Sequence, residues 1–351
     1  MQALFLLVCV LLFQAALITG FSGYYPEDGH LAVHFIDVGQ GDAIFIQTPT
    51  HHVLIDGGDR GDTVPEYLLS RGIDLIHIMI GTHPHADHIG GLINVMQQME
   101  VLEVIDPGVV HTTRTFEEYL TLIDEKDIRF TIGRAGMTRD IGEGIRMDIL
   151  HPENPSHTHL NDASVVVRIT YGSVSFLFSG DAEVHSEMEM LRRSQTLAST
   201  VLKVGHHGSR TSTSPLFLAA VDPEVAVIMT GTGNRYGHPH EETMSSLSRM
   251  NIEIYRTDLH GNIVISTDGA DYHVDVYEPY LYEGEAAAGF GININTAALQ
   301  RLQDIIHISE RRARELIALR PFHSLDELTQ ISGIGAARLQ DIKDQGLAYI
   351  E

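Results

Sequence analysis

The stretch from His83 to His88 constrains the fold of this chain more than any other feature. It reads His-Pro-His-Ala-Asp-His and follows an apolar run, residues 75–82, that is typical of a buried strand. The residues after it have helical periodicity. Because side chains of an extended segment repeat every second residue, we expect His83 and His85 to point the same way and bind one metal ion. Asp87 and His88, at the turn into the helix, are expected to bind a second.

Imidazole and carboxylate ligands suit zinc, manganese or iron, and we expect one or two divalent ions, zinc or manganese. The alternative is a surface loop that happens to be rich in histidine, since the chain has 21 histidines in all. That alternative does not explain why the cluster stands between a strand and a helix.

Two later apolar strands also end in candidate ligands. The strand ending at Phe178 is followed by Ser-Gly-Asp, which places Asp181 where a carboxylate can bridge two cations. Its alternative role is the N-cap of the helix that follows. The strand 201–204 is followed by Gly-His-His, so His206 and His207 are both candidates.

Polar residues near these ligands suggest how a substrate is held. The segment after His207 offers hydroxyl groups and one cation to an anionic oxygen; its residues are Ser209, Arg210, Thr211 and Ser212. A flexible polar loop is the alternative. His238 is a ligand, a proton donor or a turn residue. The carboxylates in 37–42 and 56–58 either orient ligand histidines or belong to hairpin turns.

Charge and cysteine content narrow the function further. The chain has 351 residues and a formal net charge of −24, which argues against broad electrostatic binding of nucleic acid. Its one cysteine, Cys9, lies in the N-terminal apolar segment, so a chain without that segment has neither disulfides nor thiolate ligands.

Residues 1–22 are predicted to be a signal peptide or a membrane anchor, because 1–21 are apolar and contain no Lys, Arg, Asp or Glu. A buried N-terminal strand or helix is the alternative. We therefore expect an exported protein that is secreted, periplasmic or anchored to the outer face of the cytoplasmic membrane. No later segment has the roughly twenty apolar residues of a membrane span.

The order of the predicted elements indicates an α/β fold. Two sets of strands, each flanked by helical segments, predict a four-layer αββα sandwich over residues 31–277. Residues 278–290, rich in Ala, Gly and Glu, are predicted to be a linker. Residues 291–351 are predicted to form a small all-α domain that carries 7 Lys+Arg against 8 Asp+Glu.

These motifs together resemble the metallo-β-lactamase superfamily and, more narrowly, the hydrolase domain of the ComEC family of competence DNA-uptake proteins. The matching stretches are HFIDVGQGDA (34–43), LIDGG (54–58), THPHADHIGG (82–91), SGD (179–181), VGHHGS (204–209) and YGHP (236–239). The resemblance implies a metallo-β-lactamase sandwich. ComEC-type proteins are multi-span channels, so DNA translocation is not carried over.

The resemblance also implies roles for individual residues. His83 and His85 would bind metal one, Asp87 and His88 metal two, and Asp181 would bridge the two ions. His206 would be the last superfamily histidine, with His207 as its rival. The loop before the strand at Ser164 lacks a clear middle histidine, and His159 or Asn161 is the candidate for that position. Asp87 and His238 are predicted to be the catalytic residues.

Residues 291–349 resemble the tandem helix-hairpin-helix of ComEA-type DNA receptors. The matching stretches are ININTA (292–297), IALRPFHSLDEL (317–328) and ISGIG (331–335). Backbone N–H groups of Gly333, Ile334 and Gly335 would contact a DNA phosphate. The first hairpin has His307-Ile308-Ser309-Glu310 instead of glycines, and Glu310 would oppose phosphate. A structural or protein-binding helical module is the alternative.

The function predicted from these features is an extracytoplasmic metal-dependent phosphodiesterase or nuclease that acts on DNA and is linked to competence-type DNA handling. The first alternative keeps the hydrolase and changes the substrate to another ester or a lactone. The second is a non-catalytic DNA-binding surface module. DNA is the expected partner, and the N-terminal segment is the one expected membrane contact.

Overall fold

The computed structural model of this chain describes residues 30–142, 144–155, 159–193, 195–276, 279–280, 282 and 292–350. The predicted N-terminal segment 1–22 and most of the predicted linker 278–290 lie outside the described residues. Within the described ranges, no helix has the length and apolar character needed to cross a membrane.

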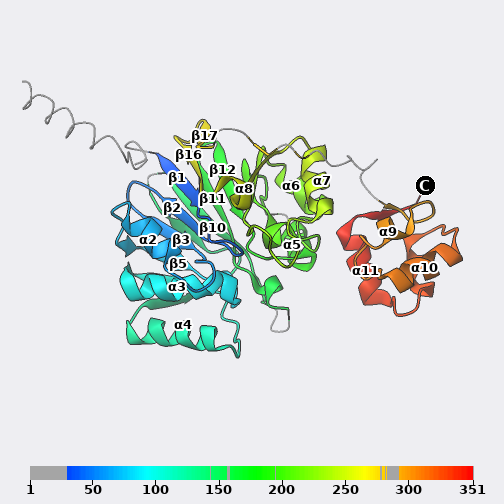
Figure 1. Cartoon of the computed structure of the whole chain (residues 1–351), viewed down its shortest axis with the longest axis horizontal. Helices are drawn as coiled ribbons and strands as arrows, with labels where there is room; N and C mark the ends of the chain where they lie inside the picture. Colours follow the sequence, from blue (N-terminus) through cyan, green and yellow to red (C-terminus); the bar gives the residue numbers. More distant parts are fainter. Residues whose placement is uncertain are drawn as a thin grey trace, which may run out of the picture.

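Two mixed β-sheets form the centre of the larger domain (Figure 1). The first sheet is built from strands in residues 31–132 and 263–274, and the second from strands in residues 138–256. The first sheet has the order β17 (Tyr272–Val274), β16 (Ile263–Thr267), β1 (Leu31–Phe35), β2 (Ile44–Gln47), β3 (His52–Ile55), β5 (Ile78–Ile80), β7 (Glu103–Asp106), β8 (Arg129–Ile132). The second has the order β15 (Glu253–Arg256), β14 (Val225–Ile228), β13 (Val201–Lys203), β12 (Val174–Phe178), β11 (Val166–Tyr171), β10 (Ile145–His151), β9 (Thr138–Asp140). A short pair, β4 (Leu75–Ile76) and β6 (Glu100–Val101), lies beside the first sheet.

Helices cover the outer faces of the two sheets. The helices packed on the first sheet are α2 (Thr63–Leu69), α3 (Ala86–Gln98) and α4 (Arg114–Glu125). Those on the side of the second sheet are α5 (Val184–Arg192), α6 (Pro215–Val221), α7 (Glu241–Arg249) and the short α8 (Thr257–His260). Side chains along each strand point alternately to the two faces of the sheet, which produces three apolar layers. Phe176 and Phe178 pack between the sheets, whereas Leu177 packs under the helices. This is the predicted four-layer αββα sandwich.

Parallel pairing collects the functional loops at one edge. β3, β5 and β7 run parallel in the first sheet, and β12 to β15 run parallel in the second. The carboxyl ends of parallel strands meet at the same edge of a sheet, so the segments after β3, β5, β12 and β13 emerge together. The predicted strand 75–82 is in fact two strands, because β4 pairs with β6 whereas β5 pairs with β3 and β7.

The C-terminal residues form a separate small core (Figure 1, right). Its elements are β18 (Ile292–Asn293), α9 (Leu299–Leu302), α10 (Glu310–Leu319), the 3-10 helix η3 (Leu325–Gln330), α11 (Ala336–Gln345) and β19 (Ala348–Tyr349). This module contacts the larger domain through α11 and α5, where Arg192 pairs with Asp344 at 3.1 Å.

Candidate metal centre

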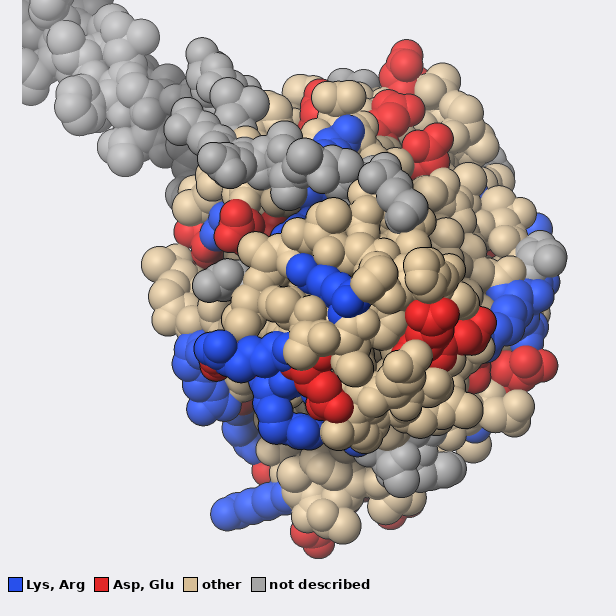
Figure 2. Space-filling model, turned by 90° about the vertical axis from the view of Figure 1, so that its right-hand side faces the viewer, with Lys and Arg blue, Asp and Glu red and all other residues tan. Residues whose placement is uncertain are grey.

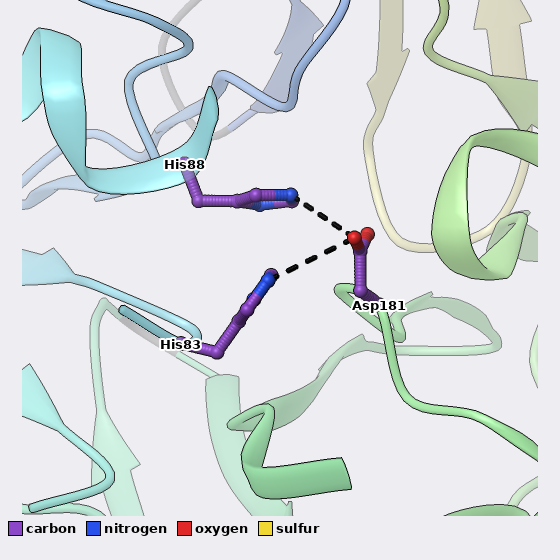
Figure 3. Close-up of side chains that lie close together, drawn as sticks. All are labelled: His83, His88 and Asp181. Atoms are coloured by element: carbon purple, nitrogen blue, oxygen red, sulfur yellow. Dashed lines mark ion pairs between the residues drawn. The ribbon is translucent and has the colours of Figure 1, made fainter. Parts of the chain in front are cut away.

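Asp181 lies at the centre of a cluster of buried side chains at the sheet edge. The Nε2 atoms of His83 and His88 are 3.8 and 3.3 Å from Asp181 Oδ2 (Figure 3), and His207 Nε2 is 3.5 Å from Oδ1. The helix after β12 begins at Val184 with Glu183 as its N-cap residue. The alternative that Asp181 serves as an N-cap is therefore wrong, and its carboxylate is directed at the histidines instead.

The donor atoms of this cluster fit a divalent cation. His83, His88 and Asp181 place one ligand atom each within 4.8 Å of one another, and so do Asp87, His88 and His207. His88 Nε2, His207 Nε2 and Asp181 Oδ1 are buried atoms with no hydrogen-bond partner. Buried polar atoms are nearly always satisfied, so these three unpartnered atoms fit a site that holds a divalent cation.

Two ligand pairs were predicted for the histidine cluster, and its four residues lie close together around the start of α3. His83 and His85 lie side by side, with His83 Nε2 2.9 Å from His85 Nδ1. Asp87 and His88 begin α3, and Asp87 Oδ2 is 3.9 Å from His88 Nε2. His85 is half-buried and does not belong to the compact ligand groups formed by the described residues.

The two consecutive histidines after β13 diverge. Both have left-handed backbone angles, φ 47° for His206 and 54° for His207, which turn their rings in different directions. His207 is buried, with Nε2 3.6 Å from Asp87 Oδ2. His206 directs Nδ1 to Glu183 and Thr211, each at 3.2 Å, and its Nε2 is 3.7 Å from Asp181. The geometry therefore places His207, the rival, among the compact ligand groups.

The loop that was expected to supply a middle histidine contributes differently. His159 is exposed and lies in a hollow with Glu183, Thr211 and His307, outside the ligand groups. Asn161, in the 3-10 helix η1 (Asn161–Ala163), donates to Glu183 at 3.3 Å, while its buried Oδ1 has no partner.

Two buried aspartates orient the ligand histidines from behind. Asp56 accepts hydrogen bonds from the backbone N–H and the hydroxyl of Thr82, and its Oδ2 is 2.8 Å from His88 Nδ1. Asp42 Oδ1 is 3.3 Å from His207 Nδ1. For the carboxylates of 37–42 and 56–58, the sequence left two alternatives open, the orientation of ligand histidines and a place in hairpin turns. Asp42 and Asp56 lie where the first alternative expects them. Asp56 thereby fixes which ring nitrogen of His88 is free to bind metal. The Nδ1 of His207 hydrogen-bonds the carbonyl of Met229 at 2.9 Å, and Asp42 lies beside that bond.

Charges in the cluster shift its pKa values in opposite directions. Although burial opposes it, Asp181 and Asp42 raise the pKa of His207 to about 9. Burial also opposes the charged form of His88, yet Asp181 and Asp56 raise its pKa well above the ordinary value. Burial and the neighbouring His88 lower the pKa of His83 well below the ordinary value. Metal binding at neutral pH must therefore displace protons from His88 and His207.

The predicted substrate loop requires a correction. Ser212 is buried and its hydroxyl donates to the carbonyl of Ala182 at 2.8 Å; Ser209 is buried and its hydroxyl is 3.0 Å from that of Thr211. These hydroxyls hold the loop against the segment before α5, because a buried donor must find a partner. Arg210 is exposed and pairs with Glu242 at 2.9 Å, and the hydroxyl of the half-buried Thr211 donates to Glu183 at 2.9 Å. A ligand held by these two residues would replace those carboxylates.

His238 lies at the mouth of the cluster. Its ring centroid is 5.5 Å from that of His206 and 4.8 Å from that of His240. Burial, together with His206 and His240, lowers the pKa of His238 to about 3, so the ring is neutral at pH 7. Its buried Nδ1 has no hydrogen-bond partner.

Comparison with known proteins agrees with this geometry. The sequence profile described as "Metallo-beta-lactamase superfamily" matches residues 36–232, more than half of the chain. The chain belongs to this superfamily. The profile of the helix-hairpin-helix motif matches residues 288–345.

Relatives of this metallo-β-lactamase chain include proteins named for competence. It is 30% identical to ComE operon protein 3 of Bacillus subtilis over 71% of this chain and 34% of that protein. It is 30% identical to competence protein ComA of Neisseria gonorrhoeae over 70% of this chain and 34% of that protein. A deoxyribonuclease of Thioalkalivibrio is 33% identical over 27% of this chain and 26% of that protein. The chain thus spans about a third of the length of the first two relatives.

Several residues of the site were not found from the sequence. Ser164 bonds the backbone N–H of Asp181 through its hydroxyl at 3.2 Å, and Glu187 accepts from the backbone N–H of Ser214 at 2.9 Å. Ser and Glu are too common for their positions to carry a signal. Lys203 is different, since a charged residue inside the apolar strand Val-Leu-Lys-Val is a visible anomaly.

Proposed function

We propose that this metallo-β-lactamase domain is an extracytoplasmic phosphodiesterase whose substrate is nucleic acid, most simply DNA. The observation that carries the proposal is the placement of the helix-hairpin-helix module beside the metal centre. Thr211, which contacts the ligand loop, and His307, from the first hairpin, line the same hollow. The module therefore lies close to the candidate ligands, on the far side of a hollow that also carries the carboxylates of Asp162, Glu183, Asp341 and Asp344.

In this proposal His83, His88, Asp181, Asp87 and His207 hold one or two divalent ions, with His85 beside them. The bound ions, zinc or manganese, supply an activated water and neutralise charge on the phosphate. Asp56 and Asp42 keep the imidazole rings oriented. Arg210 and Thr211 bind a non-bridging oxygen, and the neutral ring of His238 hydrogen-bonds the scissile phosphate.

The second hairpin supports nucleic acid as the polymer. Gly335 is the N-cap of α11, and a Cβ atom there would meet nothing within 4 Å. Arg312 and Arg338 flank this turn, donating to the carbonyls of Ser332 and Gly333 at 3.1 and 2.7 Å. Figure 2 looks onto the side where the module lies and shows several groups of Lys and Arg side chains, a large one at the lower left. The backbone N–H of Ile334 already donates to the carbonyl of Ile331 at 3.0 Å, so the phosphate contact predicted for Ile334 is not supported. The amides of Gly333 and Gly335, with the nearby guanidinium groups, suit a phosphate backbone.

The experiment combines metal analysis with substrate comparison. Purified protein is assayed with added zinc or manganese against linear DNA, RNA, a small chromogenic phosphodiester, a lactone and a β-lactam. We expect DNA and the small diester to be hydrolysed, and Asp181→Asn to lose bound metal and reduce both rates by about 1,000-fold. Turnover of the lactone or β-lactam alone would contradict the proposal in favour of another ester or amide substrate. A wild-type metal content near zero would favour a non-catalytic DNA-binding module.

Export is a further part of the proposal. The charge-free apolar character of residues 1–21 supports it. Expression of the full chain in a bacterium, followed by fractionation and N-terminal sequencing, distinguishes a cleaved signal peptide from an anchor and from a cytoplasmic protein.

A further inference from the structure

Lys203 is a fully buried cation directly behind the candidate metal centre. It ends β13, inside the second sheet, and its side chain has no exposed surface. Its ammonium group forms an ion pair with Asp42 and donates a hydrogen bond to the carbonyl of Gly180 at 3.0 Å. A lysine is almost never fully buried without a charged partner, so this position has a specific role.

The two partners of Lys203 each adjoin a candidate ligand. Gly180 is the residue before Asp181, at the end of β12. Asp42 belongs to the loop after β1 of the other sheet, and its Oδ1 faces His207 Nδ1 at 3.3 Å. One ammonium group therefore joins the two sheets at the point where they supply ligands.

The contacts of Asp42 show that it acts behind the ligands. One of its oxygens is occupied by Lys203 and the other faces His207. In the same way, both oxygens of Asp56 are occupied by Thr82 and His88. Asp181 is different, because its oxygens face only histidine nitrogens.

The charge of the cluster also requires Lys203. Four carboxylates surround the site: Asp42, Asp56, Asp87 and Asp181. Among the described residues joined to them by ion pairs, Lys203 is the one cation whose charge does not depend on a histidine proton. Without it, the buried carboxylate of Asp42 would lack a permanent countercharge.

We propose that Lys203 is a positioning residue of the metal centre. Through the Gly180 carbonyl it fixes the backbone that carries Asp181. Through Asp42 it assists the Met229 carbonyl, which accepts the Nδ1 hydrogen bond of His207 at 2.9 Å, in holding that ring. A plain structural salt bridge is the competing explanation. The two explanations differ when the pair is removed as a whole, because a structural pair can be replaced by neutral groups without effect on the metal, whereas a positioning pair cannot.

The test compares Lys203→Met, the double variant Lys203→Met/Asp42→Asn and the control Lys126→Met, which changes an exposed lysine at the end of α4. Each full-length protein is measured metal-free for its Tm, then for zinc affinity and for the visible spectrum of its cobalt(II) form. Lys203→Met leaves the buried Asp42 carboxylate without its ion-pair partner. We therefore expect the Tm of this variant in the metal-free state to fall by roughly 10 °C. The double variant should regain most of this loss.

The cobalt spectrum and the zinc affinity of the double variant distinguish a positioning pair from a structural salt bridge. We expect an altered spectrum and zinc binding at least about tenfold weaker, since displaced outer partners of ligand histidines have effects of that size. Wild-type values for both would overturn the proposal and leave a structural salt bridge. If Lys203→Met does not fold, the double variant is compared with Asp42→Asn alone, and equal zinc affinities would assign the effect to Asp42 and overturn the proposal for Lys203. A wild-type protein that takes up neither ion overturns the metal centre too, whereas a metal-loaded protein without phosphodiesterase activity leaves this inference standing.

Discussion

At the scale of single residues, the sequence was most informative where the spacing of residues alone determines the direction in which their side chains point. The alternation of His83 and His85 and the position of His88 at the start of α3 follow from strand and helix geometry. The choice between His206 and His207 does not, because it depends on two successive residues with positive φ that no local pattern in the sequence predicts. Lys203 could have been singled out as a charge in an apolar strand, but its partner Asp42 is distant in sequence.

Alanine substitution of the two neighbouring histidines tests which one binds metal. His207→Ala should lower the metal content and reduce turnover by about 100-fold, because Nε2 of the buried ring faces both Asp87 and Asp181. His206→Ala should retain the metal, because its Nδ1 is engaged with Glu183 and Thr211. Elemental analysis of both variants gives the answer, and the reverse result would restore His206 as the superfamily ligand.

Asp106 predicts a pH-dependent stability that is independent of the metal centre. Burial raises the pKa of this carboxyl from 3.8 to about 7. A raised pKa in the folded state favours the protonated form, so its stabilising effect is present below about pH 4 and is lost as the pH rises through about 7. Asp106→Asn removes this loss and should be more stable than the wild type at pH 8 by on the order of 2–4 kcal/mol.

Urea unfolding of both proteins at pH 5 and pH 8, at equal metal content, measures this difference. Other titrating groups are common to the two proteins and cancel in the comparison. Stability curves that remain parallel from pH 5 to pH 8 would show that Asp106 titrates normally.

At the scale of elements, the strands that end at the candidate ligands were predicted within about two residues. No element was predicted for residues 100–140, which form β6, β7, α4, β8 and β9. β8 has exposed Phe130 and Ile132 at the edge of the first sheet, so its pattern does not alternate between core and solvent. The Gly-Gly pair in α3 was noted only as part of a motif. Its reason is spatial: an added Cβ at Gly91 would lie 1.9 Å from the carbonyl oxygen of Gly57.

Gly91→Ala should therefore push α3 away from the loop after β3 and disturb His88 relative to Asp56. We expect a loss of about 3 kcal/mol in unfolding free energy, since the clash is with backbone that cannot rotate away. Gly61→Ala, where an added Cβ meets nothing within 4 Å, should change stability by less than about 0.5 kcal/mol. Chemical denaturation compares them, and equal stabilities would mean that the helix tolerates the shift.

At the scale of the whole molecule, the fold class and the C-terminal helical module followed from the order of strands, helices and motifs. Their mutual placement did not, because it depends on contacts such as Arg192 with Asp344 that join distant parts of the sequence. The chain as a whole has a net charge of −24, so binding of a polyanion by the module, as proposed above, would require a local surface. The second hairpin is the surface of the module that meets this requirement.

A single added charge at that hairpin tests the proposal. Gly333 has φ +80°, so any substitution there strains the backbone, whereas Gly335 has φ −92° and open space around it. Gly335→Glu should therefore fold normally but weaken binding to long DNA by about tenfold, or 1.4 kcal/mol, because a carboxylate occupies the expected phosphate position. Gln340→Glu adds the same charge to an exposed position of α11 and should have little effect.

Gel-shift titrations at two salt concentrations measure both variants, with a shallow salt dependence expected since few phosphates are neutralised. Equal affinities for Gly335→Glu, Gln340→Glu and the wild type would show that the hairpin does not contact DNA, and the module would then be a structural or protein-binding unit.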